Sequence, residues 1–276
     1  MLNQFCENLH YNLNHPHWPY NAWKRLFANK PLKVDWDADA FGALAKKWCF
    51  VPAGPRAWLN TKKAYKKTPM ELAKAWERSF EWYTTGPNYA QRGWYHKEYS
   101  PQLAGKKIID IGSGLAVDTI KWARDGAQVT FLDVVETNLE VITRLSKYFG
   151  FKAEFLHLKH LEDLKHLPYD FDFAFALGSL HHAPSSVIKP EVQELIRHIK
   201  PGGRWIQLAY PKSRWMRDGQ MDFGVWGIVL DGRGTPWAEW YDIEKLKTLW
   251  APACFEVIKS FEFADNQFIW FDLKVC

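Results

Sequence analysis

Cysteine is scarce in this 276-residue chain, and it is spread too widely to form a recognisable metal motif. No two of the four cysteines form a C-x-x-C pair, and the nearest two are more than 20 residues apart. This spacing argues against a zinc or iron–sulfur site, so we expect no metal. Thiols scattered along a cytosolic chain usually stay reduced. The cysteines are Cys6, Cys49, Cys254 and Cys276.

Long hydrophobic runs are also missing. No apolar stretch approaches the ~20 residues that a membrane-spanning helix needs. The first residues show no basic start followed by an apolar core, so no secretory signal is visible. We therefore expect a cytoplasmic protein that has no membrane partner.

The composition has no strong bias of the kind that marks disordered, collagen-like or coiled-coil chains. Hydrophobic residues make up 47% and charged residues 24%, as in an ordinary globular protein. The length suits one large α/β domain or two small ones. The net charge of +5 comes from residues 1–100, which hold 15 Lys and Arg against 8 Asp and Glu. This bias favours an anionic substrate or is simply a solvated face.

Tryptophan, by contrast, is abundant. The chain has 16 tryptophans, and half of them lie before residue 101. Tryptophan side chains fill cores, but they also line pockets for aromatic rings, sugars and cations.

A regular alternation of strand and helix patterns begins after residue 100. Strands that alternate with helices predict a doubly wound α/β sheet, and a hairpin at the end adds an antiparallel pair at one edge. The predicted strands are residues 107–111, 128–133, 153–158, 171–177, 204–209, 255–263 and 268–275, and the predicted helices are residues 117–125, 137–149, 186–199 and 242–250.

The part before this alternation is less regular. Residues 1–67 show no sustained period and predict loops and short helices. Thr68 and Glu71 then form a capping-box pattern around a proline, which predicts a helix that runs to about residue 82. After a break, residues 89–99 predict a second short helix.

These patterns suggest two domains and an insertion. We assign residues 1–100 to an N-terminal helical cap and residues 101–276 to the α/β core. Residues 211–241, an irregular segment rich in Trp and Gly, interrupt the core after its fifth strand.

The segment IIDIGSGLA at 108–116 is an apolar strand followed by a small-residue turn that opens a helix. Gly112 and Gly114 would let a ligand approach the backbone closely, although tight turns need glycine in any case. Asp133 ends the next strand, about 20 residues on, where a carboxylate can accept hydrogen bonds from ribose hydroxyls. The alternative is that Asp133 caps the helix that follows.

Two kinds of nucleotide cofactor fit such a turn. Dinucleotide binders use G-x-G-x-x-G/A, and Val117 at the sixth position breaks this pattern. Asp110, at the end of the first strand, suits a cation better than a pyrophosphate. The residues thus favour S-adenosylmethionine, which carries an ammonium and a sulfonium, and disfavour a dehydrogenase.

With these residues, the chain resembles the class I S-adenosylmethionine-dependent methyltransferases. The segment at 108–116 resembles their first motif. Three later segments match further motifs in the right order: TFLDV at 130–134, FDFAFALGSLHH at 171–182 and LIRHIKPGG at 195–203. The resemblance covers about residues 85–275.

The resemblance implies a seven-stranded sheet whose last strand is antiparallel, in agreement with the terminal hairpin. It also implies direct methyl transfer from S-adenosylmethionine, which leaves S-adenosylhomocysteine. Asp110 would lie near the methionine end, and Asp133 would bind the ribose. The other cofactor-binding residues carried over are Gly112, Ser113, Gly114, Val134 and either Leu177 or Gly178.

Relatives often place an acid after the third strand to bind the adenine amine. In this chain the corresponding stretch, HLKHLED at 157–163, has an ambiguous register. Asp163 is one candidate, and backbone groups near His160 and Leu161 are the other.

His181 and His182 lie where the substrate pocket of this family opens. A histidine there could take a proton from an attacking hydroxyl or amine. The alternative is that each histidine packs or caps the next helix. Methyl transfer often needs little more than placement of the nucleophile in line, so a dedicated base is not required.

Two segments are candidates for closing the site. In the first, Arg92 could pair with the methionine carboxylate, and Tyr89 or Tyr95 could close over the substrate. The second is the insertion, where the alternative is a hydrophobic plug. Its candidate lid residues are Trp215, Trp226, Trp237, Glu239, Trp240 and Tyr241.

We therefore expect a methyltransferase that acts on O or N of a small molecule, such as an aromatic ring, a sugar or an amine. One alternative is an RNA methyltransferase that uses the basic segment KKAYKK at 62–67. This segment is short and no RNA-binding module is present, which disfavours a nucleic-acid partner. The other alternative is a non-catalytic partner subunit. The sequence does not determine the oligomeric state.

Overall fold

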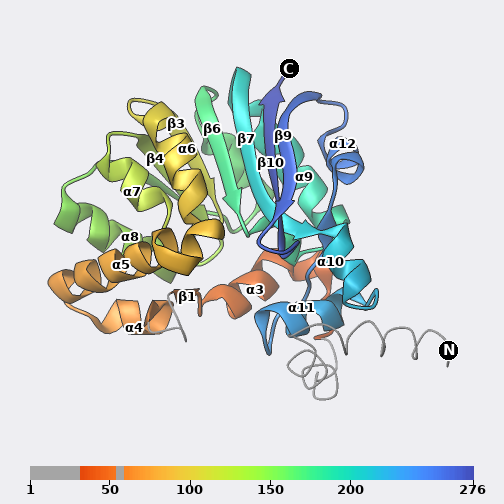
Figure 1. Ribbon diagram of the computed structural model, residues 1–276, viewed down its shortest axis with the longest axis horizontal. Helices are drawn as coiled ribbons and strands as arrows, with labels where there is room; N and C mark the ends of the chain where they lie inside the picture. Colours follow the sequence, from red (N-terminus) through yellow and green to blue (C-terminus); the bar gives the residue numbers. More distant parts are fainter. Residues whose placement is uncertain (1–31, 54–58) are drawn as a thin grey trace.

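The computed structural model describes residues 32–53 and 59–276. Its centre is a sheet with the strand order β5-β4-β3-β6-β7-β10-β9, and a short strand, β8, pairs with β7 (Figure 1). The strands are β3 (Lys107–Ile111), β4 (Gln128–Asp133), β5 (Ala153–His157), β6 (Phe171–Leu177), β7 (Ile199–Pro211), β8 (Trp240–Tyr241), β9 (Phe255–Phe263) and β10 (Phe268–Val275).

The directions of the strands confirm the predicted fold. Strands β3 to β7 are parallel to one another, whereas β10 runs antiparallel to both β7 and β9. This is the predicted mostly parallel sheet with an antiparallel last strand. The eighth strand, β8, was not predicted, because two residues are too short to leave a pattern in the sequence.

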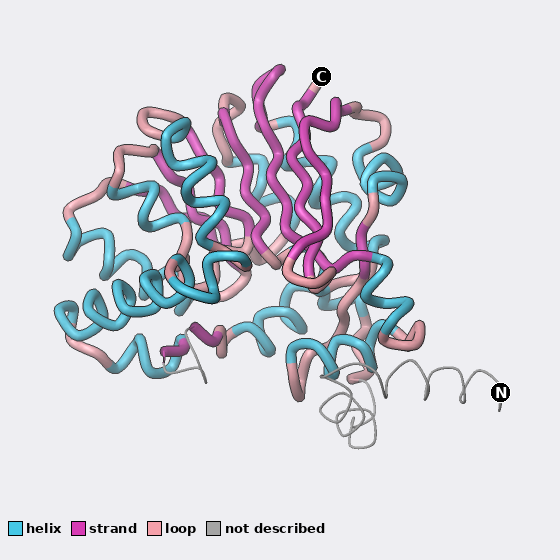
Figure 2. Tube along the Cα trace, viewed as in Figure 1, coloured by secondary structure: helices cyan, strands magenta, loops and turns pink. Residues whose placement is uncertain are grey.

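Helices cover both faces of the sheet, as the apolar strands require. One face packs against α5 (Pro69–Thr84), α6 (Gly93–Leu103), α7 (Thr119–Arg124) and α8 (Glu136–Phe149). The other face packs against α9 (Ser185–Arg197) and α12 (Ile243–Trp250). Each face thus has its own hydrophobic core, and Figure 2 shows the two helical layers around the strands.

Helix α5 begins where the capping box predicted it. Thr68 Oγ1 accepts a hydrogen bond from Glu71 N, and the Glu71 carboxylate accepts one from Thr68 N at 2.8 Å. The predicted second helix begins later than expected, at Gly93, because a 3₁₀ turn, η2 (Gly86–Ala90), precedes it.

The insertion at 211–241 was expected to be irregular, and that expectation is wrong. It contains two helices, α10 (Lys212–Arg217) and α11 (Phe223–Asp231), besides β8. Asp222 caps α11 by accepting from two backbone amides. Gly227 lets α11 pack directly on the chain, since a Cβ there would lie 2.8 Å from the carbonyl carbon of Trp237. Gly227, one of the glycines that suggested a loop, therefore serves close packing.

The N-terminal segments lie below the carboxyl edge of the parallel strands, where Figure 1 draws them in orange. They are α3 (Trp36–Trp48), β1 (Pro52–Ala53), β2 (Leu59–Asn60) and α4 (Thr61–Lys66). Residues 1–31 and 54–58 of the predicted cap, with Cys6, lie outside the described residues. Within the described part, no helix is both long enough and apolar enough to span a membrane.

Candidate functional site

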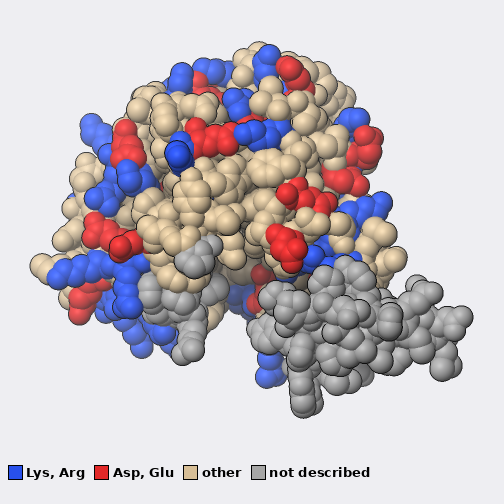
Figure 3. Space-filling view, viewed as in Figure 1, with Lys and Arg blue, Asp and Glu red and all other residues tan. Residues whose placement is uncertain are grey.

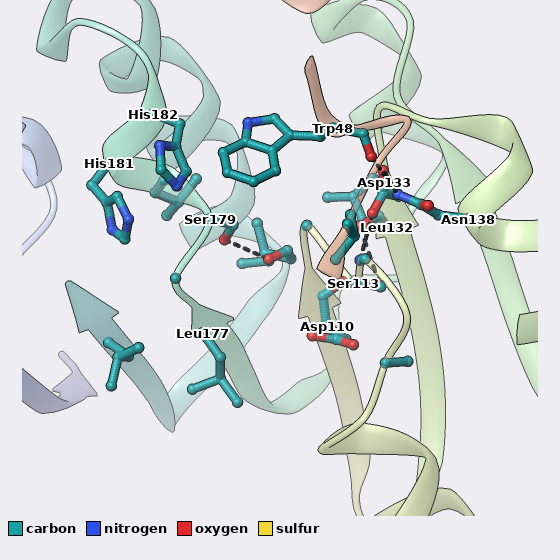
Figure 4. Close-up of a pocket in the computed structure, with 18 of the residues that line it drawn as sticks. Trp48, Asp110, Ser113, Leu132, Asp133, Asn138, Leu177, Ser179, His181 and His182 are labelled. Carbon is teal, nitrogen blue, oxygen red and sulfur yellow. Dashed lines mark hydrogen bonds between the residues drawn. The ribbon is translucent and has the colours of Figure 1, made fainter. Parts of the chain in front are cut away.

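A cavity of about 350 Å³ opens at the carboxyl edge of the parallel strands. It has mostly apolar walls with a few acids and histidines, as small-ligand sites do. Figure 4 shows Trp48 lying across it, between His182 and Asp133. The predicted site residues that line the cavity are Arg92, Asp110, Gly112, Ser113, Gly114, Asp133, Val134, Leu177, Gly178, His181 and His182.

The turn after β3 forms the floor of the cavity. The backbone amides of Gly112 and Ser113 both donate to the Leu132 carbonyl, at 2.8 and 3.0 Å, and this ties the turn to the end of β4. Gly112 has a φ of +69°, and a Cβ there would lie 2.4 Å from the Ser179 side chain. Only glycine fits this position, because both the backbone angle and the space exclude a side chain.

Asp133 is anchored by its own turn and helix. One carboxylate oxygen accepts from Gly114 N at 2.6 Å, and the other accepts from Val135 N at 2.8 Å and from Asn138 Nδ2 at 3.3 Å. Burial raises the pKa of Asp133 to about 6, although these donors oppose the rise. Because each carboxylate oxygen has two acceptor sites, one oxygen can still receive a ligand hydroxyl.

Asp110 lies deeper in the cavity, at the end of β3. Its carboxylate accepts from Thr119 Oγ1 at 2.5 Å. Burial, with smaller contributions from the nearby carboxylates of Asp118 and Asp133, raises the pKa of Asp110 to about 7. No ion pair reaches Asp110 within the described part of the chain. A ligand cation would therefore meet a carboxyl group that lacks a counter-charge.

Arg92 reaches the cavity from the residue before α6. Its guanidinium pairs with Asp118 at 2.8 Å, and Asp118 also accepts from Tyr95 Oη and contacts His96 Nε2, both at 3.0 Å. Burial raises the pKa of Asp118, but Arg92, His96 and Tyr95 outweigh burial and lower it to about 2. Arg92 is thereby held in one orientation by an ionised partner.

The two histidines after β6 form the opposite wall. His182 Nδ1 lies 3.2 Å from the Trp237 carbonyl. Since a carbonyl can only accept, Nδ1 carries the proton and Nε2 keeps a free lone pair. Burial lowers the pKa of both His181 and His182, so both rings are neutral near pH 7. The His182 ring packs on Trp48, with centroids 4.4 Å apart.

Sequence reasoning missed several residues that line the cavity. Tyr210 ends β7, and its hydroxyl donates to the Asp231 carboxylate, whose two oxygens both lie at 3.0 Å. Trp48 and Asn138 come from segments without a motif, and Asn138 Nδ2 contacts the Trp48 carbonyl at 3.4 Å. Only the place of Tyr210 at the end of a core strand offered a signal in the sequence.

Glu191 was also missed. It lies on α9, lines the cavity beside Leu158 and Ile188, and is only 5% exposed. Burial raises its pKa to about 7. A helix pattern gives no hint of this residue, because a charged residue on a helix normally faces solvent.

The stretch after β5 holds the two groups that the sequence suggested for contacting adenine. Asp163 accepts from the backbone amides of Lys159 and His160, both at 2.8 Å, so this carboxylate caps η3 (Leu161–His166). The side chains that reach the cavity from this region include Leu158 but neither Leu161 nor Asp163.

The five aromatic residues predicted for the substrate do not line the cavity. Tyr89 is exposed, and the Tyr95 ring stacks on Trp270. Tyr241 is fully buried, and its hydroxyl donates to the Leu180 carbonyl at 3.1 Å. The remaining two, Trp215 and Trp237, pack around Phe223 in the insertion.

Comparison with known proteins agrees with this architecture. Residues 108–203 match a family model described as a methyltransferase domain. The ubiquinone biosynthesis O-methyltransferase of Pseudomonas fluorescens Pf0-1 is 34% identical over 104 residues, which are 37% of this chain and 43% of that protein. The enzyme of the same name from Vibrio cholerae O395 is 29% identical over 109 residues, 40% of this chain and 44% of that protein. The chain thus aligns with less than half the length of these curated relatives.

Among solved structures, a protein from Pyrococcus horikoshii OT3 superposes with a TM-score of 0.53 at 15% identity. The match covers 73% of this chain and 99% of that one, and it shows a shared fold. The prediction of a methyltransferase domain is confirmed for the matched residues. The chain therefore carries a methyltransferase domain, at residues 108–203.

Proposed function

We propose that this protein transfers a methyl group from S-adenosylmethionine to an oxygen or nitrogen of a small molecule. The observation that carries the proposal is one continuous cavity. The glycine turn with Asp110 and Asp133 lies at one end, and His181, His182 and Tyr210 lie at the other. A donor site and an acceptor site thus share the same enclosed space.

The residues at the first end fit the methyl donor. Gly112 and Gly114 line the cavity without side chains, and Asp133 keeps one acceptor site for a ribose hydroxyl. Asp110 and Arg92 offer opposite charges for the ammonium and carboxylate of the methionine end. Ser113, Gly114, Val134 and Gly178 line the cavity and would complete the donor site, whereas the predicted Leu161 does not line it. When bound, the sulfonium supplies an electrophilic methyl group.

The histidine wall provides a general base for the acceptor. His182 Nε2 has a free lone pair because its other ring nitrogen is held by the Trp237 carbonyl. A neutral imidazole can accept the proton that a hydroxyl or amine loses as it is methylated. His181 packs between His182 and Tyr210, at ring-centroid distances of 4.3 Å to each, and would position both.

The acceptor would contact Tyr83, Tyr210, Asp231 and Phe268, which line the same cavity. Trp237 and Tyr241 would support this wall from behind, through the His182 and Leu180 contacts. The aligned relatives are named O-methyltransferases, which supports an oxygen acceptor. The division into a cap of residues 1–100 and a core of residues 101–276 is part of this proposal.

The first test is a binding experiment. Calorimetry with S-adenosylmethionine, S-adenosylhomocysteine and NAD should give binding of the first two only. Tight NAD binding without binding of S-adenosylmethionine would overturn the proposal. A panel of phenols, sugars and amines with methyl-labelled donor then identifies the acceptor, and His182→Ala should lower its turnover roughly 10²- to 10⁴-fold. The Kd for S-adenosylhomocysteine should not change in that variant.

A second candidate is methylation of RNA, for which the basic helix α4 is the only support. Lys62, Lys63 and Lys66 are exposed, and Figure 3 shows a blue cluster in this region at the lower left. Phosphate contacts would make binding fall steeply with salt. Submicromolar RNA binding at physiological salt that a Lys62/Lys63/Lys66/Lys67→Glu variant abolishes would favour RNA over a small molecule.

A further inference from the structure

The C-terminal hairpin brings two cysteines together that lie 22 positions apart in the sequence. In the β9–β10 ladder, Val275 pairs with Phe255 and Lys274 pairs with Glu256. The next rung is formed by Cys276 and Cys254, because Cys276 N donates to the Cys254 carbonyl at 3.3 Å. The two cysteines therefore stand opposite each other where the hairpin opens.

Their side chains also share one face of the hairpin. Lys274 and Glu256 lie two residues from Cys276 and Cys254 on the same two strands. Lys274 Nζ lies 3.3 Å from Glu256 Oε2 across the hairpin. Since side chains two residues apart point to the same face, the thiols of Cys276 and Cys254 lie on this face too. The two thiols interact, which raises the pKa of Cys276 above its ordinary value. Both cysteines are exposed and reduced.

The spacing of such a pair suits a covalent link. Directly opposite residues in a hydrogen-bonded antiparallel pair have Cα atoms about 5.5 Å apart. A disulfide usually spans Cα separations of about 4.4–6.8 Å. No backbone movement is therefore needed to join Cys254 to Cys276. Cys49, the other cysteine in the described residues, lies at the end of α3, outside this hairpin.

We propose that Cys254 and Cys276 are a site of reversible disulfide formation. The oxidant is a small-molecule disulfide such as oxidised glutathione. One thiolate attacks it and forms a mixed disulfide, and the second thiolate then displaces the remaining glutathione. In total the two cysteine thiols lose two protons and two electrons, and two glutathione thiols are formed.

This disulfide would close the open end of the hairpin. β9 is the outermost strand, and β10 is its only partner in the described sheet. In Figure 1 the start of β9 and the end of β10 lie together at the top of the sheet, whereas the parallel strands end at the bottom. The link would therefore stabilise the edge strand without reaching the cavity, and it does not depend on the proposed methyl transfer.

The test uses the full chain, purified in reductant and then incubated with oxidised glutathione at pH 8. Remaining thiols are alkylated, and the mass of the intact protein and its linked peptides are measured. We expect two fewer alkylated cysteines and a peptide pair that joins residues 254 and 276. Cys254→Ser and Cys276→Ser should each abolish that pair, whereas Cys49→Ser should retain it. The oxidised protein should melt roughly 5 °C higher, and dithiothreitol should reverse the shift.

Three results would overturn the proposal. They are full alkylation of both cysteines under excess oxidised glutathione, glutathionylation of either without a cross-link, and a cross-link to another cysteine. The serine variants replace exposed side chains. Circular dichroism verifies that they fold, if their melting curves in reductant equal that of the unmodified protein. Because the readout is a mass, it stands apart from any result on donor binding.

Discussion

Individual side chains at the carboxyl edge combine structural and proposed ligand contacts. The Asp133 carboxylate holds the glycine turn through Gly114 N and the start of α8 through Val135 N. In the proposed function, the same group would receive a ribose hydroxyl. Asp133 thus contacts the backbone at the start of α8 without occupying its N-cap position, and its carboxylate keeps an acceptor site for the proposed ligand contact.

The first prediction concerns this residue. Asp133→Ala should weaken binding of S-adenosylhomocysteine by about 2–4 kcal/mol, because charge-assisted hydrogen bonds contribute about 1.5–3 kcal/mol each and do not add fully. Calorimetry gives the Kd, which should rise about 30- to 1,000-fold. Asp133→Asn keeps the shape and separates the loss of charge from the loss of the side chain. An unchanged Kd in a folded variant would remove Asp133 from the donor site.

The second prediction concerns Glu191, whose pKa burial raises from 4.5 to about 7. The folded state therefore binds more protons than the unfolded state between these values. The contribution of Glu191 to the stability of the folded state is present below about pH 4.5 and is lost as the pH rises through 7. Glu191→Gln removes this loss, so the variant should be more stable than the unmodified protein at pH 8, by up to about 3 kcal/mol.

Urea denaturation at pH 5 and pH 8 measures this effect. The stability gain of Glu191→Gln should be larger at pH 8 than at pH 5. Glu140→Gln, an exposed position on α8, is the matched control and should show no such difference. Equal gains at both pH values would mean that Glu191 is not desolvated in the folded protein.

At the scale of elements, the sheet and its helices are joined by buried polar links as well as by apolar packing. Asp272 on β10 is fully buried and accepts from Tyr99 Oη of α6 at 2.7 Å and from Arg204 Nε of β7 at 2.6 Å. Trp270 Nε1 donates to the same tyrosine hydroxyl at 3.0 Å. This network fixes the antiparallel strand against its neighbour and against the helix above.

The third prediction follows from that network. Asp272→Leu should destabilise the fold by about 3 kcal/mol, because it leaves the Arg204 charge and the Tyr99 hydroxyl without their acceptor. The double variant with Arg204→Met should recover part of the loss, since no partly buried charge then remains. Guanidinium denaturation of both variants provides the comparison. A loss below 1 kcal/mol in the single variant would contradict this account of the strand pairing.

At the scale of the whole molecule, the cavity is an acidic site closed by elements from distant parts of the chain. Trp48 from α3 lies across it, and Lys47 Nζ donates to the Asp231 and Arg233 carbonyls, at 3.1 and 3.2 Å. The N-terminal segment and the insertion thus meet at the carboxyl edge. The result is a cavity in which burial raises the pKa values of Asp110, Asp133 and Glu191 toward neutral pH.

The fourth prediction uses this titration. Without ligand, the pKa of Asp110 is about 7 and that of Asp133 about 6. A ligand ammonium favours the ionised form, so binding should release protons at pH 6.5. Affinity for S-adenosylhomocysteine should rise as the pH increases from 5 and level off above about 7.5.

Calorimetry at pH 6.5 in two buffers of different ionisation enthalpy counts the released protons. Asp110→Asn should bind more weakly and release fewer of them. Proton uptake on binding, or an affinity that does not vary between pH 5 and 7.5, would show that these carboxyl groups do not face the ligand in the way we propose.

Local patterns determined most of the core. Apolar strands such as residues 171–177, the Thr68–Glu71 capping box and the glycine turn at 112–114 are read correctly from the sequence, since neighbouring residues alone decide them. The motif order placed Asp110 and Asp133 at one sheet edge, because parallel strands end on the same side. The fold, and the grouping of Asp110, Asp133 and the glycine turn in one cavity, could therefore be predicted from the sequence.

Only the tertiary structure decided the acceptor end, the closing elements and the pairing of distant side chains. The tryptophans and glycines of the insertion indicated a loop over the substrate, yet they build two packed helices whose aromatic side chains face away from the cavity. Trp48, Glu191 and Asp231 reach the cavity from segments without a motif. Cys254 and Cys276 become neighbours through strand register. These contacts join residues far apart in the chain, and no local pattern encodes a distance that the packing of whole elements sets.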